Sequence, residues 1–284
     1  MAKSDKKQDN LERLSLSFHQ TFIPERRYLS SLLRYVAEPK DVNLDEVADA
    51  TGIPTGESSG KVEPTLNYAK GMGLLDISRG EVSRWRLHIS PFGSSVLKED
   101  PFMSDGFTQW LLHLQLCRRR GGAEAWYAVF AEGYLALGKS FSNENLKAFL
   151  MARYGKRSNI VGPLVRMYIS EISFGACGAL IAEDGLVRRI SAPCDLSHFP
   201  GYGYLLFSLW DTNFNGVQQL CLDDFERESR FFAAAGWDLP QINRFVDYLA
   251  DEQFLKVDRQ TGNAVLLRTC GTERLLNNLY INLL

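Results

Sequence analysis

The chain has 284 residues and carries 32 lysines and arginines against 34 aspartates and glutamates, for a formal net charge of −2. Its length suits two or three small domains, and its hydrophobic fraction of 45% excludes a mainly disordered protein. The near-neutral charge argues against a histone-like or ribosomal role, although it is compatible with DNA binding through a local basic surface.

The first 100 residues predict a polar tail and then a small DNA-binding domain. We expect a flexible tail over residues 1–15 and a winged helix-turn-helix with an N-terminal arm over residues 16–100. Apolar residues at three- and four-residue spacing predict a helix over 28–36. Asn43 is a good N-cap for a second helix, and Gly80 marks the turn of a two-stranded wing.

The third helix of such a domain is the one that enters the major groove. Its exposed side and the wing carry hydroxyl, amide and cationic groups, which suit phosphates and base edges. The residues expected to contact DNA are Ser58, Ser59, Lys61, Thr65, Asn67, Lys70, Arg79, Arg84 and Arg86. The alternative is a winged helix that only docks proteins or spaces domains, because a fold alone does not imply a function.

The rest of the chain predicts a helical middle domain and a second winged-helix-like domain. Residues 101–200 carry apolar helical stripes, with a turn and a short strand near Asp184. Residues 201–284 predict two helices followed by a hairpin with its turn at Gly262. The predicted fold class is therefore mainly α with small β-hairpins.

The sequence lacks the motifs of several common cofactor and catalytic sites. The sequence has no P-loop, no dinucleotide-binding glycine motif, no nucleophile elbow and no HExxH zinc motif, so we expect no organic cofactor. Its five cysteines form no CxxC pair, which favours reduced thiols in a cytoplasmic protein. No apolar stretch approaches the roughly 18 residues of a membrane span, and we expect no membrane partner.

The arm carries the densest set of polar side chains within an apolar frame, LSFHQTFIPERRYL at residues 16–29. His19 can transfer a proton near neutral pH. Thr21, Arg26 and Arg27 can hold a phosphate through their donor groups. The alternative is that these side chains tie the arm to the core by hydrogen bonds, as buried polar groups require.

Acidic residues that could hold metal ions are present but scattered. A two-metal phosphodiesterase requires several carboxylates that converge on the ions. The candidates are Glu124, Glu171, Asp211, Asp223 and Asp224. Their spacing does not predict convergence, and for each one a solvated surface carboxylate is the alternative.

Four stretches together resemble a bacterial family, the SspB-like proteins of single-strand DNA phosphorothioation systems. They are FHQTFIPERRYL at 18–29, GLLD at 73–76, FTQWLLHLQLCRRRGGAEAWYAVF at 107–130 and EISFGACGALIAEDGLV at 171–187. The family motifs fall on His19, Gln20, Thr21, Phe22, Arg26, Trp110, Leu112, His113, Glu171 and Cys177. The resemblance spans nearly the whole chain, except that residues 192–215 match poorly and that an additional residue between Phe22 and Arg26 keeps Arg27 as an alternative to Arg26.

This resemblance implies a metal-dependent DNA nickase that opens one strand so that sulfur can replace a phosphate oxygen in an anti-phage defence system. It implies double-stranded DNA, a Mg or Mn ion, an ATPase, a PAPS-reductase-like ATP pyrophosphatase and a cysteine desulfurase as cofactor and partners. Under this hypothesis His19 transfers protons, Arg26 binds phosphate and Glu171 serves the metal or acts as a general base. The alternatives are a non-catalytic winged-helix DNA-binding specificity or regulatory subunit of the same complex, and a scaffold for the sulfur enzymes.

Overall fold

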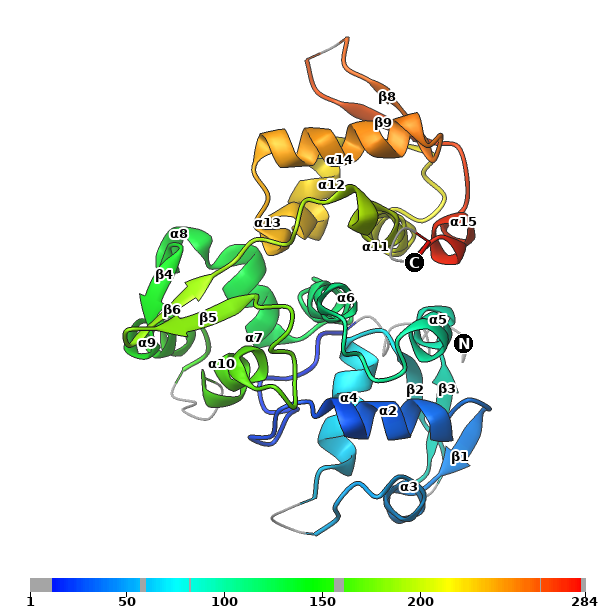
Figure 1. The fold of residues 1–284 in the computed structure, drawn as a ribbon, viewed down its shortest axis with the longest axis vertical. Coiled ribbons are helices and arrows are strands. Elements are labelled where there is room, and N and C mark those ends of the chain that lie inside the picture. The colour runs from blue at the N-terminus through cyan, green and yellow to red at the C-terminus, as the bar shows by residue number, and fades with distance from the viewer. Residues whose placement is uncertain (1–11, 57–59, 82, 156–160, 261, 282–284) are drawn as a thin grey trace. The chain divides into compact units, whose positions relative to one another are not determined.

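The computed structural model describes two compact units (Figure 1). The described residues are 12–56, 60–81, 83–155, 161–260 and 262–281. Unit 1 spans residues 1–129 and 133–190, and unit 2 spans residues 130–132 and 191–284. The boundary expected at residue 100 lies inside unit 1. Within the described ranges, no helix is long and apolar enough to cross a membrane.

The chain repeats one arrangement of elements three times: a short strand, two main helices and a hairpin. The first repeat comprises β1 (Lys40–Val42), α3 (Leu44–Thr51), α4 (Val62–Gly71), β2 (Leu75–Arg79) and β3 (Trp85–Ile89). The middle repeat comprises β4 (Ser140–Ser142), α9 (Asn143–Tyr154), α10 (Val161–Ile169), β5 (Leu180–Glu183) and β6 (Leu186–Arg189). The third comprises β7 (Gln219–Cys221), α12 (Leu222–Ser229), the short α13 (Phe231–Ala235), α14 (Leu239–Asp251), β8 (Leu255–Asp258) and β9 (Val265–Arg268). In each antiparallel sheet the last strand lies between the other two, in the orders β1-β3-β2, β4-β6-β5 and β7-β9-β8.

Further helices precede, connect and follow the repeats. They are α2 (Arg26–Tyr35), α5 (Pro91–Glu99), α6 (Gly106–Leu116), α7 (Glu124–Trp126), the π-helix η1 (Tyr127–Glu132), α8 (Tyr134–Leu137), the 3-10 helix η2 (Leu196–His198), α11 (Phe199–Asn213) and α15 (Thr272–Asn277). The expectation of a mainly α fold with small β-hairpins is therefore confirmed. Residues 101–200 contain the turn at Asp184 and the strand predicted there, and also two strands that the sequence did not indicate. The three- and four-residue strands β4, β5 and β6 are too short to show an alternating pattern.

The three repeats share the backbone path that leads from the last helix into the hairpin. In each repeat this path begins with a residue of positive φ. That residue is Gly73 in the first repeat (71°), Gly178 in the middle repeat (60°) and Gln253 in the third (58°). The carbonyl of the next residue accepts the N–H of the residue that follows the hairpin. These pairs are Ser90 to Leu74 at 3.0 Å, Ile190 to Ala179 at 3.0 Å and Thr269 to Phe254 at 3.2 Å. The same hydrogen bond thus closes each repeat.

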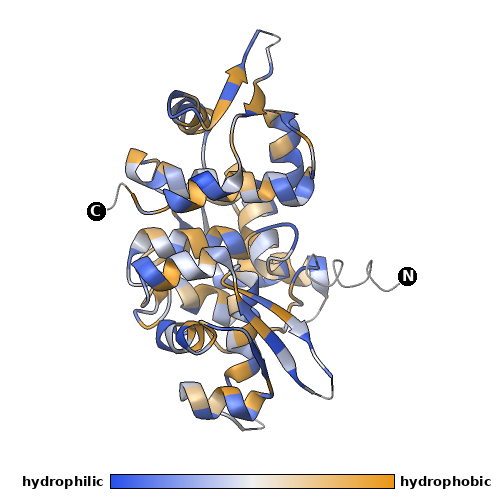
Figure 2. Cartoon of the chain, turned by 90° about the vertical axis from the view of Figure 1, so that its right-hand side faces the viewer, coloured by the Kyte–Doolittle hydropathy of each residue, from blue (hydrophilic) through white to orange (hydrophobic). Residues whose placement is uncertain are grey.

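Local sequence signals explain the ends of the first repeat. Asn43 is the N-cap of α3, as the sequence predicted, and it forms a reciprocal capping box with Glu46. Gly52 ends this helix at a φ of 72°. Burial alternates along β2 and β3, which pairs Ile77 with Leu87 on the inner face. Hydrophilic and hydrophobic residues accordingly follow one another along the hairpin strands (Figure 2).

The core of unit 1 contains α6, whose residues are all buried except for the first. His113 on this helix is fully buried, and its Nδ1 lies 2.6 Å from the hydroxyl of Tyr168. Trp126 Nε1 donates to the same hydroxyl at 2.9 Å. Burial lowers the pKa of His113 to about 3, so this histidine is a neutral member of a core network.

The N-terminal segment joins unit 1 earlier than the sequence indicated. Leu14 forms a parallel bridge with Ala123, and its N–H donates to the carbonyl of Gly122 at 2.7 Å. The expected flexible tail therefore ends before residue 14, and its residues 1–11 lie outside the described residues. This bridge fixes the start of the arm, which we define as residues 16–25.

Candidate functional site

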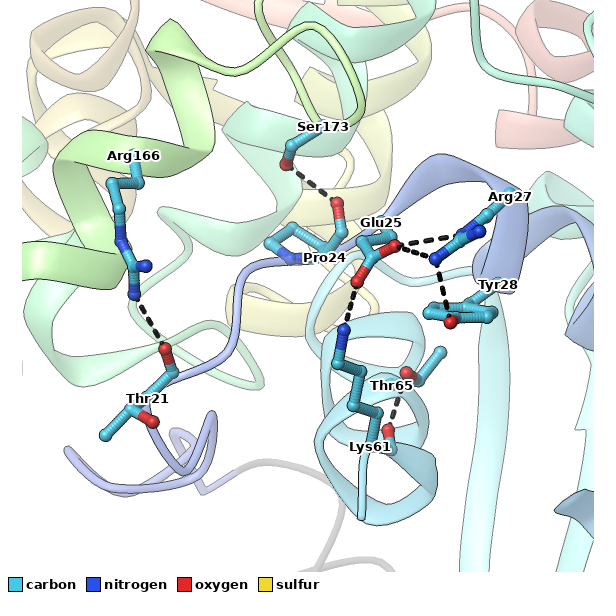
Figure 3. Close-up of polar contacts among 9 residues, drawn as sticks. All are labelled: Thr21, Pro24, Glu25, Arg27, Tyr28, Lys61, Thr65, Arg166 and Ser173. Atoms are coloured by element: carbon cyan, nitrogen blue, oxygen red, sulfur yellow. Dashed lines mark hydrogen bonds and ion pairs between the residues drawn. The ribbon is translucent and has the colours of Figure 1, made fainter. Parts of the chain in front are cut away.

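Four side chains from other elements hold the arm through its backbone carbonyls. The side-chain donors and the residues whose carbonyls accept are Asn67 and Phe18 at 3.3 Å, Tyr68 and Phe22 at 3.0 Å, Arg166 and Thr21 at 2.9 Å, and Ser173 and Pro24 at 2.7 Å. Figure 3 shows the last two of these contacts. Because Asn67 and Tyr68 belong to α4 and Arg166 to α10, the arm joins the last helices of the first and middle repeats. The arm is therefore a hydrogen-bonded tether.

His19 is the buried anchor of the arm. Its side chain is 1% exposed, and its Nδ1 accepts the N–H of Thr21 at 3.0 Å. Burial and the nearby charge of Arg166 lower the pKa of His19 to about 4, against a smaller opposing effect of a backbone hydrogen bond at Leu16. The imidazole is therefore neutral near pH 7. Among the described residues, the buried Nε2 has no hydrogen-bond partner.

The two residues after His19 adopt a strained backbone. Gln20 has a φ of 46° and Thr21 a φ of 77°, a region that β-branched residues rarely occupy. The N–H of Thr21 is held by His19 and its carbonyl by Arg166, which keeps the conformation in place. Both side chains remain exposed at the surface of unit 1. Strain that neighbouring groups maintain is a common feature of functional sites.

A buried carboxylate, which the sequence did not single out, gathers two of the expected DNA-binding cations (Figure 3). The side chain of Glu25 is 6% exposed and lies 2.5 Å from Lys61 Nζ and 2.9 Å from Arg27 Nη2. Lys61 Nζ also lies 5.5 Å from the ring centres of Phe22 and Tyr28. The cluster combines cations and aromatic rings, which is typical of nucleic-acid sites. A single glutamate before a helix carries no sequence signal for this role.

Arg26 and Glu171 are in contact, but the Arg26 guanidinium bonds to the backbone of Glu171 and not to its carboxylate. Arg26 Nη2 donates to the backbone carbonyl of Glu171 at 2.7 Å, and Nη1 donates to the carbonyl of Phe102 at 3.3 Å. The backbone N–H of Arg26 donates to the carbonyl of Ile172 at 3.0 Å. In the described part of the chain, His19 bonds to neither residue. The structure therefore joins two of the three expected catalytic residues, and their roles stay predictions.

The outer face of α4 is less open than the sequence predicted. Seven of its ten residues are buried, including Thr65, which is 5% exposed and bonds to the Lys61 carbonyl at 2.7 Å. The expectation that Thr65 lies on an exposed face is wrong. Asn67 contacts the arm, and Lys70 is half-buried. The arm packs against this helix at Asn67 and Tyr68. The expected contacts Ser58 and Ser59 lie outside the described residues.

The arginines of the β2–β3 hairpin are exposed and paired with carboxylates. Arg79 lies 3.6 Å from Glu63, Arg84 lies 2.8 Å from Asp41 and 3.4 Å from Glu46, and Arg86 lies 3.5 Å from Asp41. The hydrogen bond from Arg84 lowers the pKa of Asp41. Exposed pairs of this kind contribute little stability. A DNA phosphate can therefore replace the carboxylates at low cost.

Three of the candidate metal ligands form contacts within their own unit. Glu124 pairs with Arg13 at 2.9 Å and accepts the hydroxyl of Tyr154 at 3.0 Å. Asp211 pairs with Arg268, and Asp224 with Arg227. Across the described ranges, no group of three or more His, Cys, Asp or Glu side chains could hold a metal ion. These residues therefore do not fit a metal site built by the protein alone.

Comparisons with known proteins identify the fold. No protein-family model matches the chain, and no curated protein matches it significantly. The match to a magnesium ion-bound SspB crystal structure covers 96% of this chain and 89% of the SspB chain, with a TM-score of 0.67 and 16% sequence identity. A second SspB crystal structure matches 97% of this chain and 91% of its own, with a TM-score of 0.66 and 16% identity. The chain thus has the fold of the solved SspB proteins over nearly its whole length.

Proposed function

We propose that this chain is a DNA-binding nickase of the SspB type, which prepares DNA for phosphorothioate modification in an anti-phage defence system. The observation that carries the proposal is the SspB fold over 96% of the chain, together with the motif resemblance. Its partners would be duplex DNA, an ATPase, an ATP pyrophosphatase and a cysteine desulfurase. The magnesium in one SspB structure supports a divalent ion as cofactor.

The proposal treats each repeat as a winged helix. A strand, two main helices and a closing hairpin, with the last strand in the centre of the sheet, support this view in all three repeats. In the first repeat the hairpin arginines Arg79 and Arg84 would contact phosphates. Arg27 and Lys61 would contribute from the cluster around Glu25. Because the arm packs against α4, DNA would contact the arm as well as this helix.

A second candidate is a non-catalytic DNA-binding subunit of the same complex. Two observations favour it. The described carboxylates do not gather into a metal site, and His19, the proposed proton carrier, is a buried neutral anchor. The same surface would then bind DNA without cutting it.

Supercoiled plasmid separates the two candidates. The full chain is incubated with plasmid and Mg²⁺, Mn²⁺ or EDTA, and open circles are resolved on a gel, while binding is measured in parallel. Metal-dependent open circles support the nickase, and Arg26→Ala and Glu171→Gln then test those two residues. Salt-sensitive binding without open circles would leave the non-catalytic subunit and refute the nickase.

A further inference from the structure

Arg166 carries an uncompensated positive charge on the outer side of α10. It is exposed, as are Gly162 and Ile169 at helical spacing from it. Its Nη2 donates to the carbonyl of Thr21 at 2.9 Å, and its Nε donates to the carbonyl of Gly162 at 3.3 Å. Within the described residues, no carboxylate lies at ion-pair distance from it. Three of its five N–H donors thus remain for another acceptor.

Arg27, Lys61 and the hairpin arginines, which the sequence also predicted as DNA contacts, differ from Arg166 in this respect. Arg27 and Lys61 share the carboxylate of Glu25. The hairpin arginines are paired with Asp41, Glu46 and Glu63. An anion must displace a carboxylate to reach those cations, whereas Arg166 requires no exchange of partners. Arg166 is therefore the more accessible charge for a phosphate.

Arg166 lies beside Thr21 of the arm, which has a hydroxyl side chain. Arg166 contacts the carbonyl of Thr21, whose N–H is held by His19. These two bonds maintain the positive φ of Thr21, whose side chain is exposed. Figure 3 shows the contact between Arg166 and the Thr21 carbonyl. A guanidinium and a threonine hydroxyl are the donors that proteins commonly direct at phosphate oxygens. A mere tether would not require a β-branched residue at this strained position.

We propose that Arg166 and Thr21 together bind a backbone phosphate of DNA, with His19 as the residue that positions Thr21. This inference rests on the proposed DNA binding and specifies its site. The arm then has two roles, since the contacts that tie it to α10 also orient the phosphate donors. The scissile strand would run along the arm, between α4 and α10.

Salt-dependent binding of a labelled DNA duplex, followed by fluorescence anisotropy with the full chain, tests the charge. Each phosphate contact contributes about 0.9 to the slope of log K against log salt. Arg166→Gln is expected to reduce the slope by about this amount, and Arg166→Lys to retain it. The matched control is Arg188→Gln on β6, because Arg188 is a half-buried arginine of the same repeat that is paired with Glu183 at 3.3 Å. It is expected to leave the slope unchanged.

The outcomes separate this inference from the function on which it rests. A wild-type chain that binds DNA weakly and without salt dependence refutes DNA binding and the phosphate site together. A normal wild-type slope that Arg166→Gln does not alter refutes only the phosphate site. Inorganic phosphate that competes as well as DNA does, at equal phosphate concentration, would also refute it, because the site would then recognise a free anion.

Thr21→Gly tests the hydroxyl separately from folding. Glycine adopts a φ of 77° without strain, so the melting temperature should stay the same or rise. DNA affinity should fall roughly tenfold, as expected for the loss of a hydrogen bond to a charged group. Wild-type affinity in this variant would remove Thr21 from the site.

Discussion

Acidification is expected to loosen the arm, because His19 can accept the N–H of Thr21 only while its Nδ1 is unprotonated. The pKa of His19 falls from 6.5 in the unfolded chain to about 4 in the folded protein. The unfolded chain therefore binds the proton first, and the free energy of unfolding decreases as the pH drops from 6.5 to about 4. At about 1.4 kcal/mol for each pKa unit, the total loss is on the order of 3 kcal/mol. His113 acts in the same direction from the same upper limit of pH 6.5, and its effect continues to a pH of about 3, which is its pKa in the folded protein.

Urea unfolding of the wild type and of His19→Asn, at pH values from about 7.5 down to about 4.5, measures this effect. The asparagine Oδ1 can replace Nδ1 as the acceptor and does not titrate. The variant is expected to be less stable than the wild type at neutral pH, and most of this difference should disappear at the acidic end. Parallel stability curves for the two proteins would refute the assignment of His19 as a neutral buried acceptor.

Three further substitutions test other parts of the account. Asn43→Ala removes the capping box of α3 and should lower the free energy of unfolding by about 1 kcal/mol in urea denaturation, and no change would contradict the cap. Gly93→Ala places a Cβ 2.1 Å from the carbonyl oxygen of Leu74, so it should cost roughly 3 kcal/mol, and a wild-type melting temperature would contradict this close approach. Glu25→Gln leaves Lys61 and Arg27 without their carboxylate partner, so it should lower the free energy of unfolding of unit 1 by about 1–3 kcal/mol. It should also strengthen DNA binding, because the two cations are then available to phosphate. Weaker DNA binding by a stably folded Glu25→Gln would show that Glu25 does not compete with phosphate.

Local signals predicted the local structure well. The capping residue Asn43 begins a helix as expected, since N-capping depends on only a few consecutive residues. The hairpin around Gly80 also forms. The exposed face of α4 could not be predicted in the same way, because the arm that contacts this helix is distant in sequence. Phe18, which accepts the hydrogen bond from Asn67, lies 49 residues earlier.

The candidate site depends on such long-range contacts even more strongly. Arg166 lies 145 residues from Thr21, and Lys61 lies 36 residues from Glu25. No spacing rule connects residues at these separations. The sequence did indicate the arm as the important segment, because its polar residues stand in an apolar frame. It did not indicate that His19 is buried and neutral, since burial is a property of the packed unit.

The central claim is that DNA contacts the arm and the helices that hold it. Hydrogen exchange of the full chain, with and without a DNA duplex, tests this claim most directly. The account predicts that DNA slows exchange in the arm and in α10, with smaller effects in α4 and in the β2–β3 hairpin. Protection confined to α14 and the β8–β9 hairpin of unit 2, with an unchanged arm, would contradict it.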